Sequence, residues 1–325
     1  MSKQSHSRRG FVKRAGLAVG GTLGSALVPE LAAAQAQTRA TAAPDTASKA
    51  VRFRQALTNP QGLVLPVVNS VLMARLCEME GFQAGFMGGS GFAAQYGLPN
   101  NSLGTLTEVM TYMNQVVENT NLPMLVDAED GGGSPVIVYR VVQGFERAGA
   151  ACIMIEDAVD PSTHFNGKGA PMATAEQMAN RVKAAVDARK DPNVMILVRS
   201  DAPTKGYPEQ HTLDLASACS DAGADAFYFA GFTLDQQQKA KSLLKKPLMV
   251  GSNGPASEWK SKGVDMAYTH VENVGIGAIY MALKELKTTG RFAETAKMQL
   301  PADINARLID QEGWRARAKK YGVMK

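Results

Sequence analysis

The chain has few of the residues that build disulfide frameworks or metal sites with nitrogen and sulfur ligands. Its 325 residues include three cysteines and four histidines. Cys77, Cys152 and Cys219 lie inside apolar segments, and no two of them are spaced as a short metal-binding motif. Because their number is odd and none lies in a turn-like segment, we predict buried thiols rather than a set of disulfides.

Long hydrophobic runs and basic stripes are also missing. The apolar run 15–28 is broken by four glycines, and no later run approaches the ~18 apolar residues that a membrane-spanning helix needs. The formal net charge is +5, but residues 1–36 hold five basic residues and one acid, so the remaining chain is near +1. These features exclude a nucleic-acid surface and a membrane span after residue 36, and they favour a small-molecule substrate.

Residues 1–36 have the pattern of a cleavable twin-arginine signal peptide. The paired Arg8 and Arg9 precede the apolar run, and the small-residue stretch 32–36 offers an A-x-A cleavage site at residues 34–36. We therefore expect the twin-arginine (Tat) machinery to export the chain to the periplasm, with residues 37–50 as a flexible linker. A basic amino-terminal tail without a role in export is the alternative.

Short apolar runs alternate with amphipathic stretches of helical spacing across residues 51–290. Eight such pairs predict an α/β fold, the (β/α)8 or TIM barrel, in which parallel strands close around a core and helices cover the outside. An open, doubly wound parallel sheet is the alternative. The predicted strands are residues 63–67, 84–87, 124–126, 152–155, 195–198, 226–229, 248–250 and 266–269. The predicted helices after them are residues 71–80, 106–120, 136–148, 175–188, 213–221, 234–244, 256–262 and 276–288.

Residues 291–325 lie beyond the eighth unit and are predicted to form a C-terminal helical extension. Ile304, Ala306, Leu308 and Trp314 recur there at roughly helical spacing. A closed barrel has no position left for this segment, so its apolar residues need another surface. We predict that the extension packs on a neighbouring subunit and that the protein is a homo-oligomer.

Polar side chains follow several predicted strands directly. Asp127 and Glu129 follow the third strand, two residues apart and therefore expected on one side of it, and Glu156 follows the fourth. His270 and Glu272 follow the eighth strand. In a barrel of this kind the carboxyl ends of the strands carry the active site, so these side chains are expected around one pocket.

The three acids after the third and fourth strands predict a metal site. Carboxylates held close together raise one another's pKa, and a divalent cation relieves that conflict. Oxygen ligands without converging histidine or thiolate favour Mg²⁺ or Mn²⁺ over Zn²⁺. We predict Asp127, Glu129 and Glu156 as the metal ligands. The alternative is that these acids cap helices or pair with cations such as Arg199.

Other groups at the same edge suit an anionic substrate. Gly88, Gly89 and Ser90 follow the second strand, where backbone N–H groups can approach a carboxylate or phosphate closely. Arg199 lies at the end of the fifth strand and can contact the same anion through its guanidinium group. A glycine turn with only a structural role is the alternative.

The connection over residues 158–173 is long enough to be a lid. Loops of this length in compact domains are usually functional, and closure over a site excludes water. We predict that His164 in this loop is catalytic together with Arg199 and Glu156, and Lys168 is a further candidate to reach the site. A solvated loop with an incidental histidine is the alternative.

Five segments resemble the landmark segments of the isocitrate lyase and phosphoenolpyruvate mutase superfamily in their order and spacing. The likeness runs from about Phe53 to Gly290. It implies a (β/α)8 barrel whose C-terminal helix is exchanged between the subunits of a tetramer, a bound Mg²⁺ ion, and an enolate of pyruvate or a related oxyacid. The matching segments are residues 81–84, 126–129, 155–157, 198–202 and 222–226.

The resemblance also implies roles for single residues. It makes Asp127, Glu129 and Glu156 the ligands of the metal or the anchors of its waters. The substrate carboxylate would be cradled by the glycine segment and clamped by Arg199. The cradle consists of Gly88, Gly89 and Ser90.

Several departures from the superfamily pattern narrow the activity. Lyases of the isocitrate type share a lid motif Lys-x-Cys-Gly-His, whereas this chain has residues 160–164 there, with Ser162 in the place of the proton-donating cysteine. Asn100 stands where an aspartate is frequent, and Ala230 stands where the sixth strand often ends in a glutamate. Cleavage of isocitrate or methylisocitrate is therefore not expected.

The function predicted from these residues is that of a Mg²⁺-dependent C–C bond lyase or decarboxylase. Its substrate would be a small 2-oxo or 2-hydroxy dicarboxylate such as oxaloacetate, and the metal would stabilise the enolate left by bond cleavage. Water or His164 would return the proton. The alternatives are a mutase or hydrolase of the phosphonopyruvate and phosphoenolpyruvate type, or an exported binding protein without turnover.

Overall fold

The computed structural model describes residues 47–99, 103–160 and 162–325. The expectations on the signal peptide, on most of the linker and on Asn100 concern residues outside this part. Within it, helix α2 (Lys49–Ala56) buries Phe53 completely and precedes the first strand. The three cysteines are buried free thiols, as expected.

Eight parallel strands form a single sheet in the order β1-β8-β7-β6-β5-β4-β3-β2. β1 pairs with β8 in parallel, and a bridge between Val67 and Phe86 joins the β1 and β2 segments, so the sheet closes on itself. The predicted (β/α)8 barrel is confirmed and the doubly wound sheet is excluded. The strands are β1 (Leu63–Pro66), β2 (Gly85–Met87), β3 (Met124–Asp127), β4 (Cys152–Glu156), β5 (Met195–Ser200), β6 (Ala226–Phe229), β7 (Leu248–Gly251) and β8 (Met266–Thr269).

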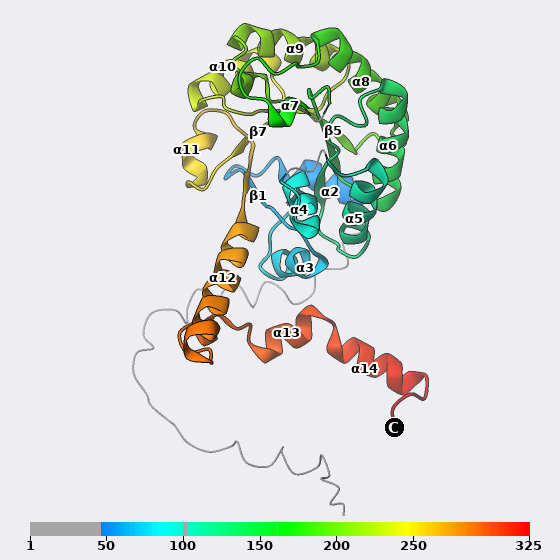
Figure 1. Ribbon diagram of the computed structural model, residues 1–325. Coiled ribbons are helices and arrows are strands. Elements are labelled where there is room, and N and C mark those ends of the chain that lie inside the picture. Colours follow the sequence, from blue (N-terminus) through cyan, green and yellow to red (C-terminus); the bar gives the residue numbers. More distant parts are fainter. Residues whose placement is uncertain (1–46, 100–102, 161) are drawn as a thin grey trace, which may run out of the picture. The chain divides into compact units, whose positions relative to one another are not determined.

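Helices follow the strands around the outside of the barrel (Figure 1). Two of them lie outside the predicted helix ranges: α4, which begins in the glycine segment after β2, and the short α7 in the predicted lid. The helices of the barrel and its loops are α3 (Val71–Met79), α4 (Gly89–Tyr96), α5 (Leu106–Glu118), α6 (Pro135–Ala148), α7 (Ser162–Phe165), α8 (Ala175–Ala188), the 3-10 turn η2 (Ala202–Lys205), α9 (Glu209–Asp221), α10 (Leu234–Leu244) and α11 (Ala256–Lys260).

The core has two layers because successive strand residues point to opposite faces. Leu65 of β1 and Met154 of β4 belong to the cluster that fills the barrel. Ile153 and Ile155 of β4 belong to the cluster between the strands and the helices. Strands buried on both faces are apolar at nearly every position. This is why the strands could be located as short apolar runs.

Capping residues determine where several helices begin and end. Ser70 accepts a hydrogen bond from the N–H of Met73 at 3.3 Å at the start of α3, and Thr174 forms a reciprocal cap with Gln177 at the start of α8. Gly149 ends α6 with φ of 95°, a left-handed conformation that glycine adopts without strain. These caps set the lengths of the helices and hence the positions of the strand ends.

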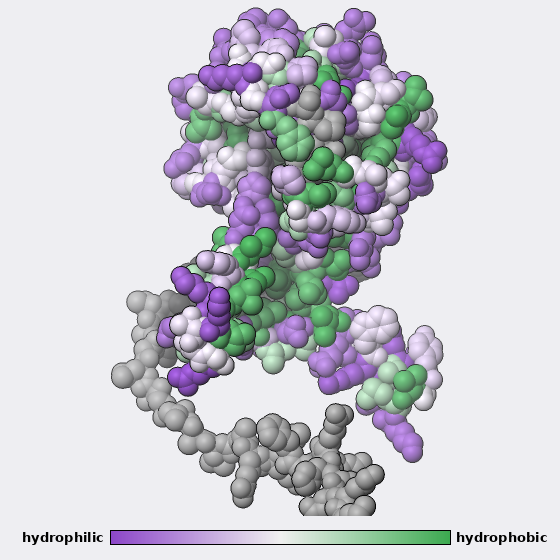
Figure 2. Space-filling view, in the orientation of Figure 1, coloured by the Kyte–Doolittle hydropathy of each residue, from purple (hydrophilic) through white to green (hydrophobic). Residues whose placement is uncertain are grey.

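Helix α12 (Val271–Thr289) does not cover the barrel, although the sequence placed it there as the eighth helix. It runs out from the end of β8 (Figure 1), and Glu272 is its one buried residue. Val64, which faces outward from β1, is left 37% exposed. Apolar surface gathers over α12 (Figure 2). The exposed apolar side chains of this helix include Val274, Ile276, Ile279, Tyr280, Met281 and Leu283.

The C-terminal extension is helical, as expected. It contains η3 (Thr295–Met298), α13 (Ala302–Leu308) and α14 (Gln311–Lys320). α13 lies against α3, where Leu308 is buried and Arg75 donates a hydrogen bond to the Leu308 carbonyl oxygen at 3.2 Å. Across the described part of the chain, no helix combines the length and apolar character that crossing a membrane requires.

Candidate active site

A pocket of about 350 Å³ opens at the carboxyl ends of the strands. The position agrees with the general rule for this barrel. The pocket brings together residues from β2, β3, β5, β6 and β8 with His164 of the lid. Its polar and aromatic lining includes Gly88, Gly89, Ser90, Asp127, Glu129, His164, Arg199, Tyr228, Tyr268 and His270.

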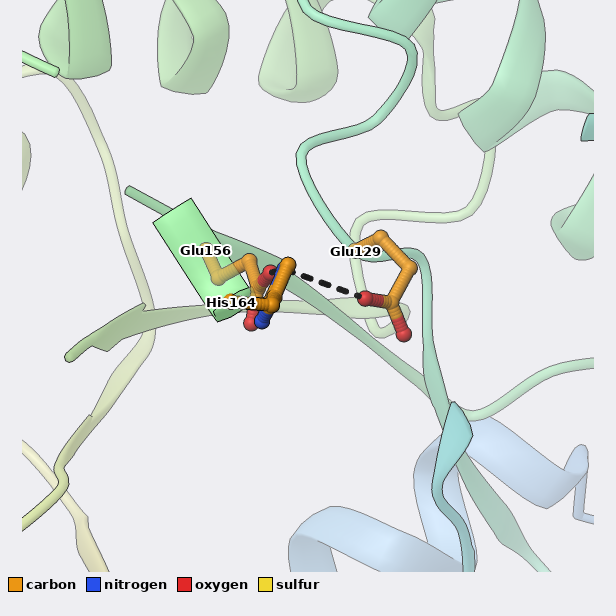
Figure 3. A group of neighbouring side chains, drawn as sticks. All are labelled: Glu129, Glu156 and His164. Carbon is orange, nitrogen blue, oxygen red and sulfur yellow. Dashed lines mark ion pairs between the residues drawn. The ribbon is translucent and has the colours of Figure 1, made fainter. Parts of the chain in front are cut away.

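Glu129, Glu156 and His164 form the group that could hold a metal ion (Figure 3). One ligand atom of each lies within 4.8 Å of those of the other two. The Nε2 atom of His164 is 2.9 Å from Oε1 of Glu156 and 3.9 Å from Oε2 of Glu129. The lid thus brings a histidine to two of the three predicted metal carboxylates, a ligand that the sequence had not suggested for the metal.

The carboxylate oxygens of this group lack the hydrogen bonds that burial normally demands. The Glu156 side chain is 1% exposed, and its oxygens lie at ion-pair distance from His164 and Arg199 without accepting a well-oriented hydrogen bond. Neither oxygen of Glu129 has a hydrogen-bond partner among the described residues. Buried carboxylates are stable when paired or bound to a metal. The donor set therefore fits a divalent cation, with one nitrogen beside the oxygen ligands.

Glu129 reaches the pocket by a route different from the expected one. Alternation along a strand does not place it there, because β3 ends at Asp127. Instead the backbone of Glu129 adopts φ of 55°, in the left-handed region that residues other than glycine rarely occupy. Its N–H donates to Oδ1 of Asp127 at 3.0 Å. The turn thus links the two acids and directs both toward the pocket.

Asp127 lies on the Arg199 side of the acids rather than in the group with His164. Nη1 of Arg199 is 3.4 Å from Oδ2 of Asp127 and 3.2 Å from Oε2 of Glu156. The other edge of the guanidinium group is bound by Asp201, with Nε and Nη2 donating to its two oxygens at 2.9 and 2.8 Å. Arg199 is therefore held in place by Asp201 and keeps Nη1 toward the acids and the pocket.

Burial and charge shift the pKa values of these acids in opposite directions. Burial raises the pKa of Asp127 to about 6 against the opposing effect of Arg199. Burial and the neighbouring carboxylates raise the pKa of Glu129 well above its usual value. Burial also acts to raise the pKa of Glu156, but Arg199 and His164 together outweigh it and lower the value. Without a cation, the group favours one ionised carboxylate beside two acids that hold protons more tightly.

Arg181 of α8 holds the loops that carry the acids. Its side chain is buried, and Nη1 donates to the carbonyl oxygens of Glu156 and Ala158 at 3.0 and 2.8 Å. Nε donates to the carbonyl oxygen of Gly133 at 3.2 Å. One guanidinium group thus joins the segments after β3 and β4, which fixes the backbone on both sides of the metal group.

The glycine segment leads directly into a helix. α4 begins at Gly89, with Gly88 as its N-cap in an extended conformation. The first N–H groups of a helix have no partner within it and favour an anion. Gly89 also interacts through its backbone with Asp127. The structure therefore places the predicted cradle, which includes Ser90, beside the predicted metal acids.

The lid is tied down at its base and carries one of its two candidate residues to the pocket. Thr163 donates a hydrogen bond to the carbonyl oxygen of Pro171 at 3.0 Å and accepts one from the N–H of Val159. His164, one residue later, reaches the carboxylates. Lys168 is exposed and is not part of the pocket lining.

Two tyrosines that line the pocket, Tyr228 and Tyr268, were not predicted from the sequence, whereas His270 beside them was expected there. The hydroxyl groups of Tyr228 and Tyr268 lie 2.9 Å apart, and Arg199 lies over the Tyr228 ring at 5.8 Å from its centre. His270 lies beside Tyr268. Inward-facing positions of β6 and β8 could have indicated the tyrosines, because alternate strand residues face the barrel interior.

Known proteins resemble this chain over most of its length. The family model for phosphoenolpyruvate phosphomutase matches residues 53–298. The 2-methylisocitrate lyase of Shewanella oneidensis is 35% identical over 63% of this chain and 70% of its own length. The oxaloacetate decarboxylase of Paraburkholderia xenovorans is 29% identical over 80% of this chain and 88% of its own length. These relatives agree with the expected enzyme class, a lyase of this superfamily other than isocitrate lyase itself.

A solved structure shows the same fold. The phosphoenolpyruvate phosphomutase from Streptomyces platensis subsp. rosaceus is similar with a TM-score of 0.76 at 24% identity, covering 84% of this chain and 99% of its own. The eight-stranded barrel, the match of the family model and the similarity to the curated relatives agree with the resemblance of the five landmark segments. The chain belongs to the phosphoenolpyruvate phosphomutase family, within the isocitrate lyase and phosphoenolpyruvate mutase superfamily.

Proposed function

We propose that the protein is a Mg²⁺-dependent C–C bond lyase or decarboxylase acting on a small 2-oxo or 2-hydroxy dicarboxylate, of which oxaloacetate is the simplest. The observation that carries the proposal is the close placement of Glu129 and Glu156, whose buried oxygens accept no well-oriented hydrogen bond from the described residues, beside a pocket with the predicted anion cradle. The oxaloacetate decarboxylase relative, which this chain matches over 88% of that protein's length, supports the substrate class.

Different residues of the chain would bind the substrate and the cation. The first turn of α4, at Gly88, Gly89 and Ser90, offers N–H groups to a substrate carboxylate. Nη1 of Arg199 offers a positive charge that Asp201 has already oriented. Glu129, Glu156 and His164 would hold the cation, with Asp127 binding it directly or through water. A Mg²⁺ ion there would polarise the 2-oxo oxygen and stabilise the negative charge of the enolate.

The lid argues against the reactions of two groups of relatives. Residues 160–164 lack the cysteine of isocitrate-type lyases, so we do not extend the activity of the 2-methylisocitrate lyase relative to this chain. Asp160 lines a second cavity, of about 150 Å³, together with Glu129 and Glu156, and its negative charge would repel a phosphoryl group. Phosphoryl transfer or phosphonate hydrolysis is therefore the second candidate.

A metal-supplemented substrate screen tests the proposal. Oxaloacetate, substituted malates and phosphonopyruvate are each incubated with the protein and Mg²⁺, and the products are identified by NMR. We expect CO2 and pyruvate from oxaloacetate, loss of turnover in EDTA, and recovery with Mg²⁺ or Mn²⁺. Turnover that persists in EDTA contradicts the metal mechanism. Binding of metal and oxyacids without any turnover favours an exported binding protein instead.

We further propose a homo-oligomer, a tetramer in which α12 of one chain covers the open face beside β1 of another. The exposed Val64 and the exposed apolar side chains of α12 support this arrangement. Light scattering of the full chain should give a dimer or tetramer. A monomer at micromolar concentration, with Val64 and α12 unprotected in hydrogen exchange, contradicts it.

We also propose export to the periplasm by the twin-arginine machinery, on the basis of Arg8 and Arg9. Replacing both arginines by lysine should retain the chain inside the cell. An unchanged periplasmic yield from that double variant contradicts the proposal.

A further inference from the structure

Tyr228 of β6 and Tyr268 of β8 form a pair of hydroxyl groups on the wall of the pocket. The two Oη atoms lie 2.9 Å apart, and both side chains line the pocket. In the closed sheet, β7 lies between β6 and β8, and β8 stands across the barrel from β4, which ends at Glu156. The hydroxyl pair is therefore on the opposite side of the pocket from the predicted metal group.

A glycine of β7 makes room for this pair. Gly251 is in register with Tyr268, and a Cβ atom at its position would lie 2.9 Å from both Cζ and Oη of Tyr268. A larger residue there would push the Tyr268 ring away from Tyr228, because the two cannot overlap. Phe86 of β2 packs edge to face against the same ring, with the ring centres 5.3 Å apart. Neighbours on three strands thus fix the Tyr268 hydroxyl.

One hydroxyl proton of the pair is left for a ligand. When two hydroxyl groups are in contact, one donates and the other accepts, so the accepting group keeps its own proton for a further partner. Among the described residues, the hydrogen bond that these two hydroxyls make is the one with each other. Because both groups line the pocket, the remaining proton is available to a molecule bound there.

The charge of Arg199 is directed to the acids rather than to this pair. Its Nη1 lies 3.4 Å from Asp127 and 3.2 Å from Glu156, and its other two nitrogens bind Asp201. The pair itself offers a neutral donor. This suits a carboxylate that leaves as CO2 and loses its charge, because a cation bound to it would stabilise the substrate more than the transition state.

We propose that this hydroxyl pair binds the departing carboxylate of the substrate and thereby selects acids that carry a second carboxylate. The inference rests on the proposed function. The metal and the cradle at the start of α4 would hold the 2-oxo acid end, so the second carboxylate extends to the opposite wall and accepts the remaining hydroxyl proton. When the C3–C4 bond breaks, its electron pair stays on the enolate, C4 leaves as neutral CO2, and the hydroxyl keeps its proton.

Malate and lactate form a matched pair of probes, because both are 2-hydroxy acids and malate alone has a second carboxylate. Calorimetry with the full-length protein and Mg²⁺ gives the Kd of each. We expect Tyr228→Phe combined with Tyr268→Phe to raise the Kd of malate about tenfold, the size of one hydrogen bond to a charged group, and to leave that of lactate unchanged. With oxaloacetate, KM should rise and kcat should not fall, because the contact is made in the ground state.

Two further variants separate this contact from packing. Gly251→Ala keeps both hydroxyl groups but forces the Tyr268 ring to move, so it should weaken the binding of malate alone. Tyr112→Phe is the matched control, because this tyrosine donates to the carbonyl oxygen of Asn69 at 2.8 Å and is not part of the pocket lining. It should leave the ratio of the two Kd values unchanged. Thermal unfolding checks that each variant is folded.

Each outcome decides between the alternatives. A double variant that weakens malate and lactate equally overturns the proposal, because the tyrosines would then only shape the pocket, and so does one that changes neither Kd. A wild-type protein that binds both probes equally has no subsite for a second carboxylate and overturns it as well. Selective binding of malate through the pair, without decarboxylation of oxaloacetate, overturns the proposed reaction and leaves the subsite. A wild-type protein that binds neither probe overturns both.

Discussion

Carboxylates at the two ends of the barrel differ in their hydrogen bonding. At the amino ends of the strands, Asp225 accepts hydrogen bonds from Arg54, Arg189 and the N–H of Ile196. Asp265, before β8, pairs with Lys241 and accepts the N–H of Leu248 in the same manner. At the carboxyl ends, the buried oxygens of Glu129 and Glu156 lie close together, and no described residue gives them a well-oriented hydrogen bond.

This contrast separates stability from function within one fold. A carboxylate surrounded by donors contributes to the free energy of unfolding, whereas buried carboxylates crowded together reduce it. The second arrangement is stable when a ligand from outside the chain pairs with the crowded carboxylates, and in the proposed function that ligand is a cation with its substrate. The hydrogen-bonded acids at the amino end of the barrel, its lower end, therefore offset the destabilising effect of the crowded acids at the carboxyl end, its upper end.

Asp127→Asn should have the largest effect on activity and little effect on folding. The substitution removes a buried charge with little change of shape, so it tests the electrostatics of the site. We expect kcat to fall by a factor on the order of 10² to 10³, as for removal of comparable transition-state contacts. Steady-state kinetics measures this, and an unchanged or higher Tm distinguishes it from misfolding. An active Asp127→Asn enzyme would contradict the placement of the site.

Metal binding should stabilise the upper end by mass action. A ligand at 100 times its Kd raises the free energy of unfolding by about 2.7 kcal/mol. Thermal unfolding with and without Mg²⁺ measures the shift in Tm, and EDTA should reverse it. Glu129→Gln should abolish most of the shift, whereas Asp225→Asn should preserve it. A shift that is equal in all three proteins would place the ion elsewhere.

Asp225→Asn should produce the opposite result to Asp127→Asn. It removes the charge from three hydrogen bonds at the lower end, where the side chain is 15% exposed. We expect the free energy of unfolding to fall by roughly 1.5–3 kcal/mol, as for hydrogen bonds to charged groups. Urea unfolding measures the loss. The kcat of the folded fraction should be unchanged. A fall in kcat would contradict the proposed separation of stability at the lower end from function at the upper end.

Glu285 in α12 tests whether a fully hydrogen-bonded carboxylate also stabilises the fold where it is exposed to solvent. It accepts bonds from the N–H groups of Ala293, Glu294 and Thr295 and from the Thr295 hydroxyl group. These bonds lower its pKa from 4.5 to about 2. Their stabilising effect is therefore present above pH 4.5 and lost as the pH falls toward 2. Hydrogen-exchange protection of the three amides should fall over that range, and Glu285→Gln should remove the pH dependence.

Most of the barrel could be predicted because its strands obey a simple rule. Strands buried on both faces, such as β6 (Ala226–Phe229), stand out as short apolar runs between glycine-ended helices. The exit of α12 could not be predicted in the same way. The spacing of its apolar residues shows that the helix has an apolar face. The spacing does not show whether the barrel of the same chain or another surface covers that face.

The site was predictable where chemistry follows a strand end directly. Asp127, Glu156 and Arg199 do so, and they line or border the pocket. Glu129 was predicted for the wrong reason, because only the backbone shows its left-handed turn. The position of His164 depended on the fold of the lid around Thr163. The pairing of His270 with Glu272 depended on a burial that spacing alone does not reveal.

The left-handed backbone of Glu129 sets stability against cation binding at this position. A residue other than glycine held in the left-handed region costs roughly 1–3 kcal/mol, and glycine at the same place would remove most of that cost. A single change, Glu129→Gly, would thus make the barrel more stable and end cation binding.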